Sequence, residues 1–138
     1  MKTFFDTSAF AKRFIQENGS AHVEEICQQT TELGLSIVCI PELISAMNRR
    51  RREKVLSDDD YEKIKTTLTN EIKDATIVNI TNSVISHSTK LLESNILRAM
   101  DSLHIACAME WNAEAFVTAD KQQLEAARRA GLSAILVG

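Results

Sequence analysis

Short apolar runs rich in β-branched or aromatic residues alternate along this chain with longer stretches of helical periodicity, and this alternation constrains the fold most. Strands that alternate with helices need right-handed crossovers, which place helices on both faces of a mainly parallel sheet. We therefore predict an α/β fold. The five predicted strands are Lys2–Phe5, Leu35–Ile40, Ala75–Ile80, Ala115–Thr118 and Ser133–Val137.

Helices are predicted between these strands from apolar spacing and from capping residues. The length of 138 residues, with 44% hydrophobic and 25% charged residues, fits one globular domain over residues 1–138. The predicted helices are Ala9–Phe14, Ala21–Thr31, a segment from Pro41 through Arg49–Arg52, a segment capped by Ser57 that extends to about Ile72, Thr81–Ser94, Arg98–Trp111 and Asp120–Ala130.

Composition disfavours several classes of protein. No apolar run reaches the ~18–20 residues that span a bilayer. Asp6 follows only two aromatic residues, unlike the apolar stretch of a signal peptide, so we expect a cytoplasmic protein with no membrane partner. The three cysteines, Cys27, Cys39 and Cys107, form no CxxC pair, which disfavours a disulfide framework and a cysteine zinc site.

The charge distribution leaves nucleic acid open as a partner. The net charge of −3 argues against it, but Arg49–Arg52 and Lys54 concentrate positive charge in one place. The arginine run spans about one helical turn, so its side chains point in several directions. A solvated face is the simpler interpretation, and contact with RNA phosphates or with a protein partner is the alternative.

Three acids lie at or just beyond the ends of predicted strands. Asp6 ends the first, Glu42 lies just beyond the second and Asp120 just beyond the fourth. Because the carboxyl ends of parallel strands share one edge of the sheet, we expect these side chains to converge there. Asp101 comes from a helix, among apolar neighbours where an acid needs a partner or a metal ion. His104, one turn later, is interpreted as a packed helix residue rather than a base.

A cluster of acids is costly unless a cation neutralises it. Two like charges about 4 Å apart repel by about 4 kcal/mol at an effective dielectric constant of 20. Carboxylate oxygens without a Cys or His constellation suit Mg²⁺ or Mn²⁺ better than zinc. Such a dication can activate water and orient a phosphate, so the pattern indicates phosphodiester hydrolysis.

Each acid also has a simpler interpretation. Asp6 and Asp120 could cap the helices that follow them. Glu42 could complement the dipole of a helix from its first turn. Asp101 could pair with Arg98, which lies one turn earlier and could also face a substrate.

In this order and spacing, the acidic segments resemble PIN-domain proteins, and specifically toxin ribonucleases of the VapC type. The resemblance covers essentially the whole chain. It rests on Phe5-Asp6-Thr7-Ser8-Ala9, Pro41-Glu42-Leu43, Asp101-Ser102-Leu103-His104-Ile105-Ala106 and Val117-Thr118-Ala119-Asp120 followed by Gly131. It implies a three-layer α/β/α fold, RNA cleavage dependent on Mg²⁺ or Mn²⁺, and a homodimer. It also implies inhibition by a small cognate antitoxin that binds near the active site and usually also binds operator DNA.

Carried over by motif, four acids become the catalytic and metal-binding quartet: Asp6, Glu42, Asp101 and Asp120. Ser8 and Thr118 become candidates for contacts that orient the carboxylates or a water, and Arg98 for contact with the substrate. Ala119 stands where the family often has a polar residue, which puts one supporting contact in doubt.

Three other functions stay open from the sequence. A solitary RNA-processing nuclease of the same family would carry the same acids and lack an antitoxin. A non-catalytic interaction module could retain the fold alone. A phosphotransfer receiver or phosphatase is disfavoured, because Asp6-Thr7-Ser8 offers no second acid and the last strand runs straight to Gly138. The RNA target is not encoded in any of these motifs.

Overall fold

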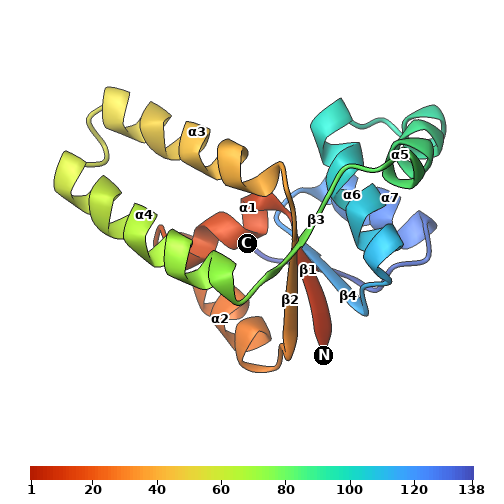
Figure 1. Ribbon diagram of the computed structural model, residues 1–138, viewed down its shortest axis with the longest axis horizontal. Coiled ribbons are helices and arrows are strands. Elements are labelled where there is room, and N and C mark those ends of the chain that lie inside the picture. The colour runs from red at the N-terminus through yellow and green to blue at the C-terminus, as the bar shows by residue number, and fades with distance from the viewer.

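Five parallel strands form the middle layer of the molecule, in the order β3-β2-β1-β4-β5 (Figure 1). The computed structural model describes residues 1–138. Every neighbouring pair of strands is parallel, which confirms the predicted α/β fold. The strands are β1 (Lys2–Phe5), β2 (Glu32–Ser36), β3 (Thr76–Val78), β4 (Ala115–Thr118) and β5 (Ala134–Leu136).

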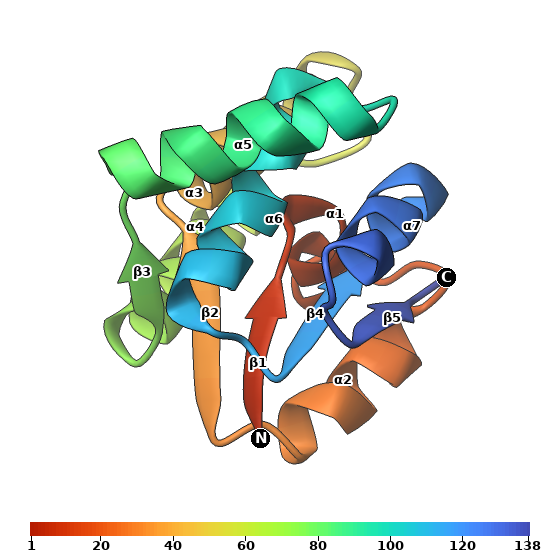
Figure 2. The same cartoon turned by 90° about the vertical axis from the view of Figure 1, so that its right-hand side faces the viewer.

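Helices connect the strands and form the two outer layers (Figure 2). Ser57 caps the helix α4 (Asp58–Lys73) by accepting a hydrogen bond from the backbone N–H of Asp60 at 3.1 Å, as its sequence position predicts. None of the helices is both long and apolar enough to cross a lipid bilayer. The helices are α1 (Thr7–Phe10), continued by a 3-10 turn (Ala11–Arg13), α2 (Ser20–Gln28), α3 (Cys39–Arg52), α4 (Asp58–Lys73), α5 (Asn82–Ser94), α6 (Ala99–Trp111) and α7 (Lys121–Arg129).

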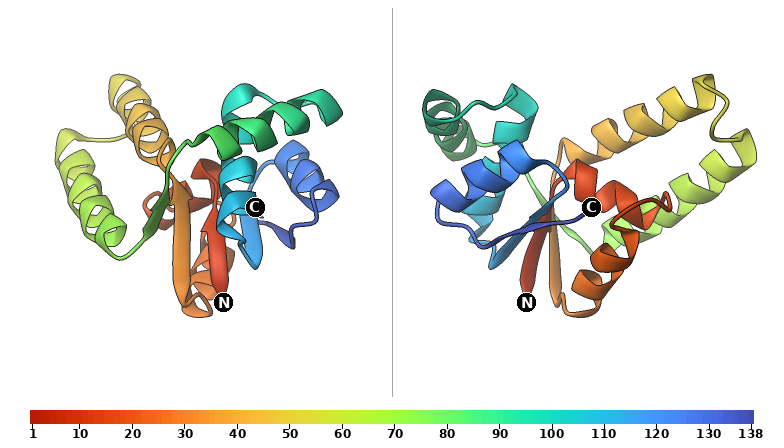
Figure 3. Two further views of the ribbon diagram at one scale, coloured as in Figure 1. Left: turned by 45° about the vertical axis from the view of Figure 1, so that its right-hand side comes forward. Right: turned by 180° about the vertical axis from the view of Figure 1, so that it is seen from behind.

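The two faces of the sheet bury separate hydrophobic clusters, because successive residues of a strand point to opposite faces. Phe5 and Val117 pack into one cluster with side chains of α1, α2, α3 and α4. Phe4 and Phe116 pack into the other, with side chains of α5, α6 and α7. The result is a three-layer α/β/α fold, in which α3 and α4 form a long pair that extends away from the sheet (Figure 3).

The prediction of a strand over Leu35–Ile40 is wrong in its extent. The strand β2 ends at Ser36, and the β-branched residues after it enter a turn and the first turn of α3. Pro41 is tolerated there because the first N–H groups of a helix have no partner within the helix. In the middle of β2, position 34 is glycine because a Cβ atom there would collide with the ring of Trp111.

Candidate functional site

The predicted acids lie around the point where the connections of the sheet change direction. Strands β2 and β3 lie on one side of β1, and β4 and β5 on the other. Open α/β sheets bind ligands beyond the carboxyl ends of the strands at such a switch point. Asp6 follows β1 and Asp120 follows β4, while Glu42 and Asp101 lie in the first turns of α3 and α6.

Asp6 is fully buried, and hydrogen bonds surround its carboxylate. The backbone N–H of Ala9 donates to Oδ1 at 2.9 Å, which makes Asp6 the N-cap of α1. Thr118 Oγ1 donates to Oδ2 at 2.6 Å, and Ser8 Oγ lies 2.8 and 2.9 Å from the two oxygens. Gln123 Nε2 donates to Oδ2 at 2.7 Å. A buried carboxylate needs this many donors because it has lost its water.

These donors do not fully compensate the burial of Asp6. Burial raises the pKa of Asp6 above its usual value, although the hydrogen bond from Thr118, the nearby charge of His104 and the hydrogen bonds from Ala9 and Ser8 all lower it. The negative form of this carboxyl group is therefore disfavoured by its surroundings. A bound cation would reverse that balance.

Asp101 lies across the amide group of Gln123 from Asp6. Gln123 Nε2 donates to Asp101 Oδ1 at 3.2 Å, so a single nitrogen contacts both carboxylates. The other oxygen, Oδ2, lies 3.4 Å from Arg98 Nε. Burial raises the pKa of Asp101, the Arg98 guanidinium lowers it and the charge of Asp120 raises it, with a net increase.

Asp120 joins the same group through Thr118. Its backbone N–H donates to Thr118 Oγ1 at 3.0 Å, and the same hydroxyl donates to Asp6. Its Oδ1 caps α7 by accepting from the N–H of Gln122 at 2.8 Å and of Gln123 at 3.4 Å. We call five residues the aspartate cluster: Asp6, Asp101, Thr118, Asp120 and Gln123.

Glu42 has a separate set of partners. Thr7 Oγ1 donates to Glu42 Oε1 at 2.6 Å, and His104 Nε2 lies 2.6 Å from the same oxygen. Burial raises the pKa of Glu42, but the hydrogen bonds from His104 and Thr7 and the charges of His104 and Arg98 lower it more, so this pKa lies below its usual value. We call Thr7, Glu42 and His104 the glutamate cluster.

His104 is almost fully buried, and its two ring nitrogens differ. A carboxylate only accepts hydrogen bonds, so Nε2 carries the proton that faces Glu42. Nδ1 is buried and has no hydrogen-bond partner. His104 is packed in its helix, as predicted, and it also orients an acid of the site, which the sequence did not indicate.

The simpler interpretation of each acid also holds. Asp6 and Asp120 cap α1 and α7, Glu42 lies in the first turn of α3, and Asp101 approaches Arg98. These local roles explain why an acid suits each position. They do not explain why one amide nitrogen, from Gln123, contacts acids that arrive from β1 and α6.

The acids fit a hard dication in their chemistry but not in their present arrangement. Carboxylate oxygens are the ligands that Mg²⁺ and Mn²⁺ prefer. No three His, Cys, Asp or Glu side chains, however, gather around one point where an ion could bind. Asp6 and Asp101 face a common gap, and the amide of Gln123 fills it. The metal site therefore stays a prediction.

The sequence did not single out two contacts in the site. Thr7 lies within the segment Phe5-Asp6-Thr7-Ser8-Ala9, but nothing in the sequence linked its hydroxyl to Glu42. Asp120 and Gln123 match the capping-box pattern, in which the later side chain folds back to the N-cap N–H. Gln123 instead turns toward Asp6 and Asp101, so the local pattern conceals its role.

An open groove of about 420 Å³ lies beside Glu42, lined from α3 by Pro41, Ser45, Ala46 and Arg49 and from α6 by Met100. The neighbouring arginines are already engaged, because Arg50 pairs with Glu17 at 3.5 Å and Arg51 with Asp58 at 2.8 Å. The basic run is thus divided, and Arg49 is its member that faces the groove.

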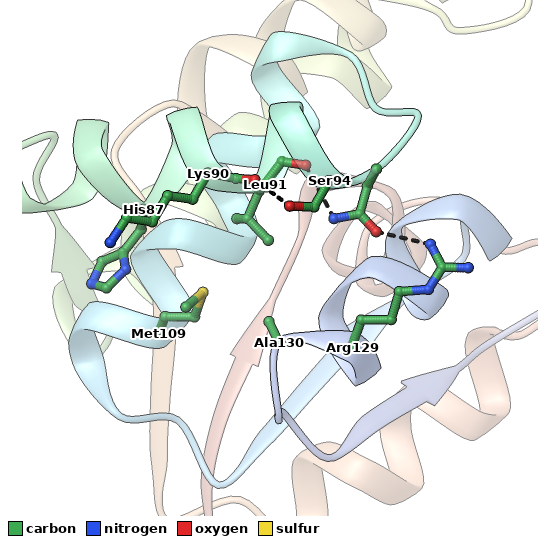
Figure 4. A pocket seen from close by; sticks show the side chains of 8 residues that line it. His87, Lys90, Leu91, Ser94, Met109, Arg129 and Ala130 are labelled. Atoms are coloured by element: carbon green, nitrogen blue, oxygen red, sulfur yellow. Dashed lines mark hydrogen bonds between the residues drawn. The ribbon is translucent and has the colours of Figure 1, made fainter.

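A second hollow, of about 220 Å³, lies between α5, α6 and α7 (Figure 4). Arg129 Nη1 donates to Asn95 Oδ1 at 3.0 Å across one end of it. None of its lining residues belongs to the aspartate or the glutamate cluster. The hollow contributes nothing to the acidic site.

Fold and site together define a three-layer α/β/α protein with acids at the switch point of a parallel sheet. The PIN domain family matches residues 3–129, nearly the whole chain, and the chain belongs to this family. None of the curated proteins matches it by sequence.

Solved structures share the fold at low sequence identity. VapBC2 from Rickettsia felis, bound to a promoter DNA fragment, is 15% identical over 100% of both chains, with a TM-score of 0.71. FitAcB from Neisseria gonorrhoeae is 13% identical over 96% of both chains, with a TM-score of 0.70. VapC20 from Mycobacterium tuberculosis, described as a toxin that cleaves the sarcin-ricin loop, is 12% identical over 94% of this chain and 95% of its own, with a TM-score of 0.68. At these identities the likeness concerns the fold.

Proposed function

We propose that this protein is a metal-dependent endoribonuclease that hydrolyses RNA phosphodiester bonds. The observation that carries the proposal is that one amide nitrogen, from Gln123, contacts both Asp6 and Asp101 at the switch point of the sheet, where Asp120 follows β4. Membership of the PIN domain family supports it. So does the likeness in fold to a toxin described as cleaving the sarcin-ricin loop.

Asp6, Asp101 and Asp120 would hold Mg²⁺ or Mn²⁺, with Glu42 completing the acidic site. When bound, the dication supplies a Lewis acid that activates water and offsets charge on the phosphate. Thr118 and Ser8 orient the carboxylate of Asp6 through the hydrogen bonds described above. His104 and Thr7 hold Glu42 in its negative form, ready to accept a proton or a hydrogen bond.

The RNA strand would approach along the groove beside Glu42. Arg49 lines this groove, and the side chain of Arg98 is 85% exposed beside Asp101. Guanidinium groups bind phosphate oxygens well because they offer several donors in one plane. These two arginines would bring the backbone of RNA close to the acids.

We further propose that the protein is the toxin of a toxin–antitoxin pair and forms a homodimer. Structures described as toxin–antitoxin complexes share its fold. Apolar side chains lie exposed on α5 and near the start of α6, where a second copy could cover them: Ile85, Leu92, Ile96 and Met100. Light scattering during gel filtration tests the dimer. Co-expression with the product of a small neighbouring reading frame tests the antitoxin, and a monomer or a lack of any complex would contradict these two parts.

The nuclease itself is tested with Asp6→Asn. Asparagine is also a good N-cap, so α1 stays capped while the charge is removed. We expect purified wild-type protein with Mg²⁺ or Mn²⁺ to cut RNA, and Asp6→Asn to reduce the rate at least about 100-fold because a carboxylate ligand is lost. Asp59→Asn, an exposed acid in the first turn of α4, is the matched control and should cut normally. Equal rates in wild type and Asp6→Asn would overturn the proposal.

A further inference from the structure

Gln123 is the neutral side chain that contacts the carboxylates of two acids in the aspartate cluster. It is 3% exposed, in the first turn of α7, and its Nε2 donates to Asp6 Oδ2 at 2.7 Å and to Asp101 Oδ1 at 3.2 Å. Its Oε1 is buried and has no hydrogen-bond partner. The hydrogen bonds of the Gln123 side chain therefore all go to the two acids, through Nε2.

An amide NH₂ group compensates these two acids only in part. Its two N–H groups match two carboxylates in number, so each acid receives one hydrogen bond. The amide is neutral, however, and a dipole offsets like charges far less than a dication does. The unsatisfied Oε1 adds a further cost to the same arrangement.

The same two oxygens cannot bind the amide and a cation at once. Mg²⁺ binds its oxygen ligands at about 2.0–2.1 Å, so an ion held by both oxygens would need the space next to them. Nε2 of Gln123 occupies this space, 2.7 Å from Asp6 Oδ2 and 3.2 Å from Asp101 Oδ1. An ion shared by Asp6 and Asp101 therefore requires that the side chain of Gln123 turn away.

We propose that Gln123 is a placeholder for the cation. It bridges the buried Asp6 and the partly buried Asp101 while the metal is absent, which keeps both acids in place, and it competes with the metal for the same oxygens. This inference rests on the proposed nuclease function, because that function supplies the cation. It also explains why no three acidic side chains lie close enough together to bind one ion.

The competition is tested with Gln123→Leu, which keeps most of the volume and removes the amide. Gln122→Leu is the matched control, because Gln122 is exposed on the same helical turn and its side chain makes no hydrogen bond. The probe is Mn²⁺ alone, titrated into each protein in a calorimeter without RNA. We expect Gln123→Leu to bind Mn²⁺ roughly tenfold more tightly than wild type, because no hydrogen bonds to charged groups need to be broken.

A second measurement needs no metal. In EDTA we expect Gln123→Leu to melt about 5 °C below wild type, since two acids lose their shared donor. Adding Mn²⁺ should raise the melting temperature of Gln123→Leu to that of wild type. Gln122→Leu should melt like wild type. Should leucine prevent folding, Gln123→Met offers a flexible, unbranched replacement with the same expected results.

The outcomes separate the two proposals. Wild type that binds Mn²⁺, with Gln123→Leu binding equally or more weakly, overturns the placeholder and leaves the nuclease standing. Equal melting of Gln123→Leu and Gln122→Leu in EDTA overturns the bridge itself. Wild type that binds no Mn²⁺ overturns the metal-dependent nuclease and the placeholder together.

Discussion

The aspartate and glutamate clusters lie at one edge of the sheet, yet their environments act on their acids in opposite directions. Burial dominates in the aspartate cluster and raises the pKa values of Asp6 and Asp101. Hydrogen bonds and nearby positive charge dominate around Glu42 and lower its pKa. One cluster thus holds acids that need additional positive charge, and the other holds an acid that is already stabilised.

The difference follows from where each acid enters the fold. Asp6 directly follows the central strand β1, so the sheet and the helices on both faces exclude water from it. Glu42 lies on α3, at the wall of an open groove, and its side chain is 29% exposed. Asp6 is therefore shielded from water, whereas Glu42 is accessible to water or to a substrate in the groove.

The largest expected effect is that of Thr118→Val in the aspartate cluster. This change keeps the shape of a fully buried side chain and removes its hydrogen bonds to Asp6 and to the N–H of Asp120. We expect the free energy of unfolding to fall by about 3 kcal/mol, because one partner is a buried carboxylate. Urea denaturation without metal measures it.

The pH dependence of stability separates the clusters next. The folded protein binds protons at Asp6 and Asp101 more readily than the unfolded chain does, because their pKa values are raised. Metal-free protein should gain stability as the pH falls from 7 through these raised pKa values, by at most about 1.4 kcal/mol per pH unit for each proton.

Glu42 behaves in the opposite way, because its folded pKa is lowered. Its contribution to stability is complete above its unfolded pKa and is lost as the pH falls through its folded pKa.

Urea denaturation of metal-free protein in EDTA, from pH 7 downward, measures these changes in the free energy of unfolding. Asp6→Asn is the control, and its difference from wild type isolates the change due to Asp6. If acidification stabilised wild type no more than Asp6→Asn, the pKa of Asp6 would not be raised in the folded protein.

Thr7→Val is the counterpart of Thr118→Val in the glutamate cluster. It removes the hydrogen bond of 2.6 Å to Glu42. We expect a loss of about 1 kcal/mol in the free energy of unfolding, because His104 stays bound and water can replace the hydroxyl. The same urea experiment measures it, and a loss as large as that of Thr118→Val would remove the distinction between a deep and a shallow cluster.

The smallest expected effect on stability is that of Arg98→Ala. Its ion pair with Asp101 spans 3.4 Å, and the arginine side chain is 85% exposed. Exposed pairs contribute little, so we expect a change of less than about 0.5 kcal/mol in the free energy of unfolding. RNA binding, measured by fluorescence anisotropy, should weaken and depend less on salt. Unchanged RNA binding would show that Arg98 does not contact RNA.

Much of the fold could be predicted because its signals are local. Strands β1 and β4 match their predicted ranges, since each is a short apolar run that ends at a polar segment. Strand β2 was misplaced because Ile37 and Val38 have the composition of a strand while the backbone there turns into α3. The pairing of β2 with β1, which begins at Lys2 and Glu32, decides where the strand lies, and it overrides the strand propensity of individual residues.

The sequence by itself determined the order of strands and helices along the chain and the position of the four acids just after a strand or near the start of a helix, because period and capping are properties of neighbouring residues. Only the tertiary structure decided which side chains meet. Gln123 reaches Asp6 across 117 residues, and His104 reaches Glu42 across 62. Such contacts depend on how far each helix rotates and leans over the sheet, which packing sets and no local pattern encodes.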